Sequence, residues 1–314
     1  IPLYTLLQRR LWDFRRLIRL ILILTLGSYG IRAYIAIMYA LTGSTVLPNI
    51  ALESAMVNWI RNDMLRVNPP CFSLLFAPFA FYYYITSNKF RDKVLGMGCM
   101  AVAVLYHVYV SQARSVLIYN VLILAMMFLF QKKTDKKKFI RILLLMVAVC
   151  ILVNTSYFND LINSFSVSNS DTGESTLARF NAIYYFGSKY MGNVLTGIGF
   201  TYESTPIGGN ISDIGFLYSI FRLGIPLIIF YLIVFIRGIT VYCRARLVDA
   251  DKAILVFGMT VLIMMTGINI DCFFNIFAFA VPFYIAIVEY VAYEISARAT
   301  ENDFMLNRSG VTEI

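Results

Sequence analysis

Long apolar runs separated by short polar or basic stretches dominate the pattern of this sequence. A helix of about 20 residues with few charges is long enough to cross the hydrocarbon core of a bilayer. We therefore predict an all-α fold, a polytopic bundle of about eight transmembrane helices that forms a single integral membrane domain over residues 1–314. The predicted spans are Leu17–Leu41, Pro69–Thr86, Val94–Val110, Ser115–Phe130, Phe139–Val153, Asp213–Ile236, Ala253–Gly267 and Cys272–Ile295.

Two segments between these spans are long, residues 42–68 and residues 154–212. The second is polar and rich in Ser and Asn, and its amphipathic stretch Leu177–Tyr190 predicts a helix inside the loop. That stretch places on one side Phe180, Ile183, Tyr184 and Phe186. Long loops with structure of their own often carry function.

Composition and charge support a membrane protein and exclude a nucleic-acid partner. The mean hydropathy is +0.71 and 59% of residues are hydrophobic, more than a water-soluble core can bury. The net charge of +9 comes from basic residues confined to short stretches between apolar runs. With the N-terminus in the cytoplasm, the inner segments hold 20 of the 27 Lys and Arg residues. The exceptions are Arg32, Arg61, Arg66, Arg114, Arg179, Lys189 and Arg222.

Five of these exceptions are arginines expected in or near the outer half of the membrane. Charge at that position is costly, which makes such residues candidates for function. A guanidinium group stays charged when partly desolvated and binds phosphate with two parallel hydrogen bonds. We therefore expect a lipid diphosphate to be bound by Arg114, Arg179 and Arg222, with Arg61 and Arg66 as further candidates.

Structural interpretations stay open for several of these residues. Arg114, in a tight outer turn, could be an interfacial arginine that reaches toward water. Arg222 lies nine residues into the predicted sixth span, about 13 Å along a helix, where it would need an acid such as Asp213 or Asp271 or a water-filled cavity. Asp213 could cap that helix or could accept a proton from an attacking hydroxyl.

The remaining chemistry-bearing residues predict neither a metal nor a cofactor. His107 is the only histidine, and it could be a hydrogen-bonded structural residue or a catalytic one. The five cysteines match no metal-binding spacing and no disulfide framework. No Walker or Rossmann pattern is present, so we expect no direct use of a nucleotide.

Residues 111–242 resemble the O-antigen polymerase and O-antigen ligase family of bacterial polysaccharide enzymes. The resemblance begins with Ser-Gln-Ala-Arg-Ser at residues 111–115, followed by an apolar span. A long loop then contains Arg179 in Leu-Ala-Arg-Phe-Asn, and it continues to Leu-Thr-Gly-Ile-Gly-Phe at residues 195–200. The last element is Asp-Ile-Gly-Phe-Leu-Tyr-Ser-Ile-Phe-Arg-Leu-Gly-Ile-Pro at residues 213–226.

The resemblance implies a multi-pass protein of the bacterial inner membrane whose active site faces the periplasm. It implies metal-independent, inverting glycosyl transfer from an undecaprenyl-diphosphate-linked glycan to a hydroxyl of another lipid-linked repeat unit. Asp213 would act as base or orient the acceptor, and Arg114, Arg179 and Arg222 would stabilise the leaving diphosphate. The expected partners are the lipid-linked oligosaccharide, membrane lipid and a chain-length regulator protein. The first residue is Ile1 and not Met, which is compatible with a start inside a longer chain.

Two alternatives remain. An O-antigen ligase would share the fold and use a different acceptor, but ligases typically carry a histidine where this chain has Asp213, which favours the polymerase. A transporter or flippase for a lipid-linked or anionic solute would use the same arginines to bind phosphate. Transporters often contain internal repeats, and we find none in this sequence.

Overall fold

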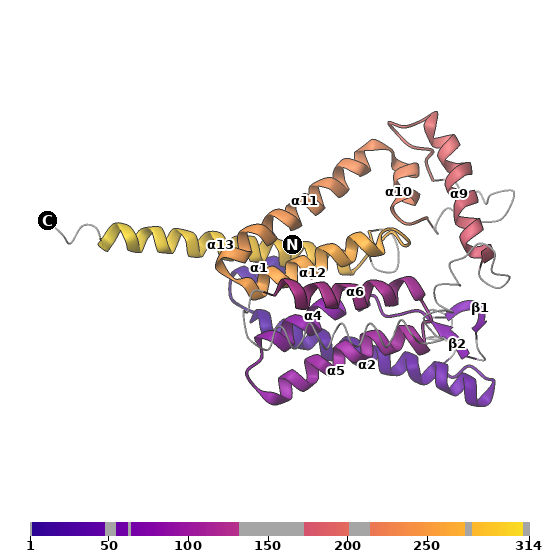
Figure 1. Ribbon diagram of the computed structural model, residues 1–314, viewed down its shortest axis with the longest axis horizontal. Helices are drawn as coiled ribbons and strands as arrows, with labels where there is room; N and C mark the ends of the chain where they lie inside the picture. The colour runs from indigo at the N-terminus through magenta and orange to yellow at the C-terminus, as the bar shows by residue number, and fades with distance from the viewer. Residues whose placement is uncertain are drawn as a thin grey trace. The chain divides into compact units, whose positions relative to one another are not determined.

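The computed structural model is predominantly helical and describes residues 2–47, 55–61, 64–131, 173–200, 214–273 and 278–309 (Figure 1). This confirms the predicted helical class, to which the structure adds one short β-hairpin. The elements in chain order are α1 (Pro2–Gln8), α2 (Phe14–Thr42), β1 (Ala55–Arg61), β2 (Met64–Val67), α4 (Ser73–Thr86), α5 (Phe90–Tyr109), α6 (Arg114–Phe130), α9 (Gly173–Met191), α10 (Phe216–Leu223), α11 (Ile225–Val248), α12 (Ala250–Thr266) and α13 (Ala280–Ser309).

The chain divides into two compact units. The first comprises residues 1–112, 235–260 and 279–314, and the second comprises residues 113–234 and 261–278. Each is described by itself below. The single membrane domain expected from the sequence stays a prediction.

Three described helices are long and apolar enough to cross a bilayer, so the chain is a membrane protein. They are α2, α11 and the part of α13 from Ala280 to Arg298. The helices α4 and α6 are apolar but shorter. Helices also occupy the predicted third and seventh spans, as α5 and α12, whereas Phe139–Val153 lies outside the described residues. The number of spans, predicted as about eight, stays a prediction.

Two predicted spans had wrong boundaries. The predicted sixth span, Asp213–Ile236, is not one helix, because α10 ends at Leu223 and α11 begins at Ile225. Gly224 between them has φ +74° and ψ −160°, a conformation that no helix contains. The predicted eighth span begins at Ala280 and not at Cys272, which lies in a turn.

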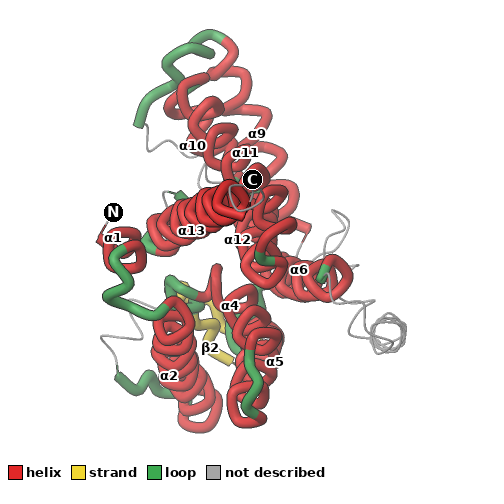
Figure 2. The backbone as a smooth tube through the Cα atoms, turned by 90° about the vertical axis from the view of Figure 1, so that its left-hand side faces the viewer, coloured by secondary structure: helices red, strands yellow, loops and turns green. Residues whose placement is uncertain are grey.

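The core of the first unit is built around α4. This helix is apolar on every side, a pattern typical of a helix surrounded by protein. Its residues Leu75, Phe76 and Phe79 are fully buried. It packs against α2 and α5, which lie beside it in Figure 2. The ring centroid of Tyr29 on α2 lies 5.1 Å from that of Phe76, so an aromatic contact joins α2 to α4 in this core.

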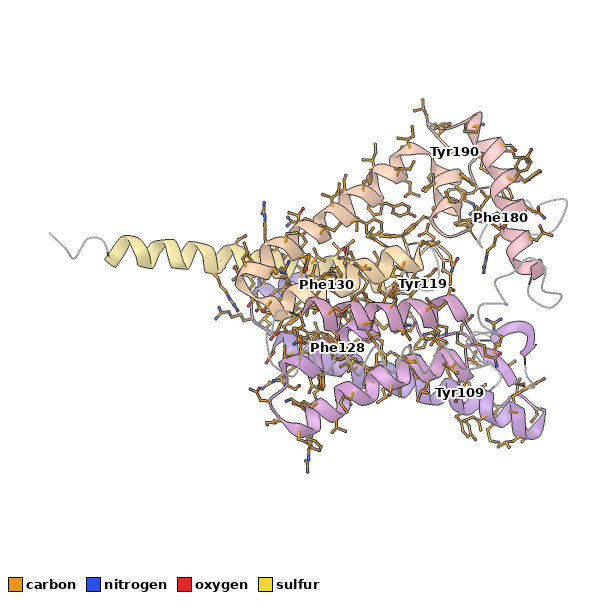
Figure 3. The ribbon with its side chains drawn as sticks, viewed as in Figure 1. Tyr109, Tyr119, Phe128, Phe130, Phe180 and Tyr190 are labelled. Atoms are coloured by element: carbon orange, nitrogen blue, oxygen red, sulfur yellow. The ribbon has the colours of Figure 1, made fainter. Side chains whose placement is uncertain are left out.

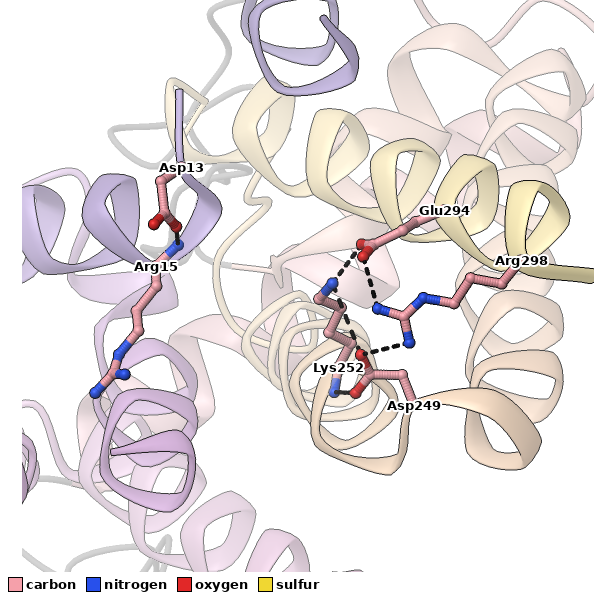
Figure 4. A network of polar contacts seen from close by, with 6 residues as sticks. All are labelled: Asp13, Arg15, Asp249, Lys252, Glu294 and Arg298. Carbon is pink, nitrogen blue, oxygen red and sulfur yellow. Dashed lines mark hydrogen bonds and ion pairs between the residues drawn. The ribbon is translucent and has the colours of Figure 1, made fainter. Parts of the chain in front are cut away.

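A charged cluster joins the turn before α12 to α13 within the first unit (Figure 4). Lys252 forms ion pairs with Glu294 and, at 3.7 Å, with Asp249. Arg298 binds the same two carboxylates at 3.0 Å and 3.7 Å. Two cations and two carboxylates therefore alternate around one ring of contacts, and the side chain of Lys252 is 12% exposed, which reduces its screening by water.

Candidate functional site

The hairpin in the first unit holds two of the candidate arginines. Arg61 ends β1, and its side chain lies outside the described part of the chain. Arg66 on β2 is buried, and its Nε donates to the backbone carbonyl of Ser111 over 3.0 Å. The hydroxyl of Tyr106 donates to the carbonyl of Val67 over 3.1 Å. Arg66 thus anchors the turn that precedes α6, a structural contact for a residue that the sequence suggested as a diphosphate ligand.

The second unit contains the other candidates, and its centre is the short helix α10. Gly215 and Gly224, both with positive φ, lie at its two ends. At the N-terminal end, the amide of Phe216 donates to the carbonyl of Gly267 over 2.7 Å, so α10 begins against the end of α12. At the C-terminal end, Gly224 turns the chain into α11. Helix α10 is therefore fixed at both ends by backbone contacts.

Backbone amides of the segment Leu195–Gly199 donate hydrogen bonds to carbonyl groups at the C-terminal end of α10. The carbonyls of the last turn of a helix have no partner inside the helix. If α10 and α11 formed one continuous helix, the amide of Ile225 would donate to the carbonyl of Phe221. Residue 226 is a proline without an N–H group, so the carbonyl of Arg222 would have no donor within that helix. The amide of Ile198 donates instead to the carbonyl of Phe221 over 2.7 Å, and the amide of Gly199 donates to that of Arg222 over 3.1 Å. The two carbonyls therefore have hydrogen-bond donors even though the helix is interrupted at Gly224.

Close backbone contact requires glycine on both sides of this junction. Gly197 has φ +74°, and a Cβ atom there would lie 2.3 Å from the carbonyl carbon and oxygen of Arg222. A Cβ atom at Gly224 would lie 2.3 Å from the carbonyl oxygen of Leu195. The two glycine-containing motifs, at residues 195–200 and 213–226, are 13 residues or more apart in sequence and pack against one another in the structure.

Arg222 is held on an aromatic surface by this junction. Its side chain is 7% exposed, and it lies in the last turn of α10 and not 13 Å inside a span. The guanidinium carbon lies 4.1 Å from the centroid of the Tyr218 ring and 5.5 Å from that of Phe200. Its Nη1 also donates to the Tyr218 hydroxyl. Aromatic rings attract a guanidinium through their negative faces, and stacking fixes its plane.

Helix α9 packs one face on α10 and carries Arg179. Ala182 and Phe186 of α9 form a buried cluster with Ile214 and Phe221. Arg179 precedes Phe186 by seven residues, two turns along the same face of the helix. It is half-buried and lies close enough to the hydroxyl of Tyr119 to act on it electrostatically. Arg179 therefore extends the buried face of α9 toward α6.

Tyr119 links this region to the helix that Arg114 begins. Arg114 is the first residue of α6, and its side chain is not among those described. The amide of Asn269 donates to the Tyr119 hydroxyl over 2.9 Å, about one and a half turns along α6 from Arg114. The helix that carries Arg179 and the first turns of α6 are thus neighbours within the second unit, whereas Asp213 lies outside the described residues.

A buried carboxylate near α10 was not predicted as part of the site. Asp271, in the connection between α12 and α13, accepts from the hydroxyl of Tyr231 over 2.6 Å and from the amide of Phe273 over 2.9 Å. Burial raises the pKa of the Asp271 carboxyl, and these donors with the nearby Ser219 hydroxyl oppose that rise in pKa. The sequence places this acid between two apolar runs, and it predicts Asp271 only as a possible structural partner of Arg222.

Neither His107 nor the other side chains that can bind metals form a second candidate site among the described residues. Both ring nitrogens of His107 are buried with no hydrogen-bond partner among the described residues. The part of the chain that the structure describes contains no group of three or more His, Cys, Asp or Glu side chains placed to hold a metal ion. Of the four residues predicted as catalytic, the structure describes the side chains of Arg179 and Arg222, which lie on α9 and α10, two helices that pack against one another. No protein-family model matches the chain, and no curated protein matches it.

Proposed function

We propose that this chain is a polymerase that joins lipid-linked glycan repeat units at the periplasmic face of the bacterial inner membrane. The observation that carries the proposal is the packing of residues 195–199 on the end of α10, which holds Arg222 against Tyr218 and Phe200. Two of the motifs on which the family resemblance rests thus meet at a buried arginine. Such a group is suited to bind an anion at a membrane surface.

In the proposed reaction the acceptor hydroxyl attacks the anomeric carbon of the donor glycan. Its oxygen forms the new glycosidic bond, the bond between that carbon and the diphosphate oxygen breaks, and the configuration at the carbon inverts. Asp213 takes the proton of the hydroxyl. Undecaprenyl diphosphate leaves with its negative charge stabilised by Arg114, Arg179 and Arg222.

The aromatic support of Arg222 is compatible with this role. Rings contact the flat face of a guanidinium, whereas phosphate oxygens bind in its plane. Desolvation by the rings strengthens the attraction between the arginine and a diphosphate, because less water screens it. Because the side chain is already fixed, little conformational entropy is lost when the anion binds.

The test is polymer synthesis by the purified protein from lipid-linked repeat units, with release of undecaprenyl diphosphate measured alongside. We expect Arg222→Ala and Arg179→Ala to abolish both products, and Arg222→Lys to restore little, because an ammonium group cannot bind bidentately. Lys189→Ala removes an exposed cation from α9 and is the matched control. Polymer of normal length from Arg222→Ala at equal protein level would refute the proposal.

The transporter alternative is supported by one observation, the interruption between α10 and α11 at Gly224. Helices broken by glycine and proline often form substrate sites in transporters. A transporter would move a lipid-linked solute across proteoliposomes and form no glycosidic bond. A ligase would transfer finished polymer to a lipid core and would not lengthen it. Lengthening of lipid-linked glycan in detergent, where no gradient exists, decides for the polymerase against both.

A further inference from the structure

Helix α9 has a second apolar face that no described residue covers. The sequence placed Phe180, Ile183, Tyr184 and Phe186 on one side, and the structure separates them. Phe186 is buried against α10, whereas Phe180 is 61% exposed and Tyr184 is 83% exposed. Figure 3 labels Phe180 on α9. Leu177 and Met191 are also exposed. We call the four exposed residues Leu177, Phe180, Tyr184 and Met191 the outer stripe of α9.

The outer stripe has the geometry of a continuous helix face. Its members follow Leu177 by three, seven and fourteen residues, so they stay on one side of the helix over about 21 Å. The two cations of α9 lie off this stripe. Arg179 belongs to the buried face, and the Nζ of Lys189 lies 4.6 Å from the centroid of the Tyr185 ring. The outer stripe itself contains no charged residue, and the uncharged Asn181 and Ser188 lie along its edge.

A backbone contact in the second unit brings the C-terminal end of α9 close to the start of a membrane-spanning helix. The amide of Ile225, the first residue of α11, donates to the carbonyl of Val194 over 3.1 Å, three residues after α9 ends. Figure 1 shows α9 at the N-terminal end of α11. Ile229 and Ile233 are exposed apolar side chains one turn apart on α11, and Leu195, 71% exposed, lies between them and the outer stripe along the chain.

We propose that α9 lies on the bilayer, with its outer stripe inserted into the interface of the leaflet at the N-terminal end of α11. Amphipathic helices with Phe, Leu and Tyr on one face bind membrane interfaces in this way. Aromatic side chains are favoured at the level of the lipid headgroups. The opposite face of α9 is fixed to α10, so this contact sets the depth of α10 relative to the lipid. The proposal does not depend on the catalytic one.

Fluorescence quenching in proteoliposomes tests this contact in the whole chain. Tyr184→Trp and Phe180→Trp place a reporter in the outer stripe, and Lys189→Trp is the matched control on another side of the same helix. The two native tryptophans contribute equally to all three variants and are subtracted with the parent protein. We expect lipids brominated near the glycerol end of their acyl chains to quench the two stripe reporters several-fold more than the control.

Quenching by aqueous acrylamide gives the complementary result, with the control quenched more strongly than either stripe reporter. Equal quenching of all three reporters by brominated lipid would overturn the proposal. Stripe reporters that respond to neither quencher would overturn it too, because the stripe would then be covered by protein or glycan and not by lipid. Elution of each variant at the parent position in gel filtration excludes misfolding as the cause.

Discussion

Two glycines with the same backbone conformation allow the contact at the α10 junction to be tested apart from backbone strain. Gly197 and Gly199 have φ +74° and +75°. A Cβ atom at Gly197 would lie 2.3 Å from the carbonyl of Arg222, whereas at Gly199 nothing lies within 4 Å. The substitutions Gly197→Ala and Gly199→Ala therefore share the cost of a left-handed alanine and differ in the steric overlap.

The expected magnitudes follow from these two terms. A left-handed alanine costs about 1–2 kcal/mol, of which the less flexible unfolded chain offsets about 0.4–1 kcal/mol. Gly197→Ala must in addition separate the two backbones by about 1 Å to restore ordinary van der Waals distance. The two hydrogen bonds from Ile198 and Gly199 would then be lost, at about 1 kcal/mol each. We expect Gly199→Ala to cost about 1 kcal/mol and Gly197→Ala about 3 kcal/mol.

Unfolding of both variants in detergent micelles, followed by tryptophan fluorescence against denaturant, measures the difference. Gly197→Ala should unfold at clearly lower denaturant than Gly199→Ala, and both should fold, because domains of this size are stable by about 5–15 kcal/mol. Equal stabilities, or a larger loss for Gly199→Ala, would refute the argument that backbone contact at Arg222 is what excludes a side chain at residue 197.

The remaining predictions concern two polar contacts outside the junction. Tyr231→Phe leaves the buried Asp271 carboxylate with one donor fewer and should cost about 1–3 kcal/mol, and a double-mutant cycle with Asp271→Asn should show that the two effects are not additive. Because the folded-state pKa of Asp271 is raised, its stabilising contribution is complete at low pH and is lost as the pH rises through that pKa. The stability of Asp271→Asn relative to the parent should therefore increase as the pH rises above the ordinary range of an aspartate, and a pH series of melting temperatures checks this. In the charged cluster, Lys252→Met should cost about 1–2 kcal/mol with little dependence on salt, because its side chain is only 12% exposed, whereas Arg298→Met, at 46% exposed, should cost less and lose its effect in high salt.

Helix positions could be predicted from the sequence because lipid-facing and buried apolar residues produce the same long runs. The predicted Leu17–Leu41 coincides with α2 within a few residues, and Ser115–Phe130 coincides with α6. Hydropathy does not detect a change of direction inside such a run. Residues 213–236 read as one span, although Gly224 and the following proline separate α10 from α11. The sequence shows this glycine and proline, but a break here also requires other donors for the carbonyls at the end of α10. Those donors come from residues 195–199, which are distant in the sequence.

The faces of α9 show a different limit. Phe180, Tyr184 and Phe186 are all aromatic, and periodicity alone cannot say which side of a helix meets protein when both sides are apolar. Likewise, nothing local distinguishes Arg66, which binds a backbone carbonyl, from Arg222, which stacks on rings. The sequence identified arginines as the residues to explain, and tertiary contacts decided what each one binds.

The break at Gly224 changes the energetic argument for Arg222. A charged residue at the centre of a spanning helix is destabilising by at least about 2.5–3.5 kcal/mol, and the earlier span prediction required an acid or a water-filled cavity to offset that cost. At the end of α10 the same residue lies outside α11, where the aromatic rings of Tyr218 and Phe200 stabilise its charge. The estimated cost for a charge at the centre of a span therefore does not apply to Arg222 as a residue of α11. The glycine that interrupts the helix is thus what makes a partly desolvated cation possible next to a membrane-spanning segment, and filling Gly224 with a side chain would act on the arginine and not on the span.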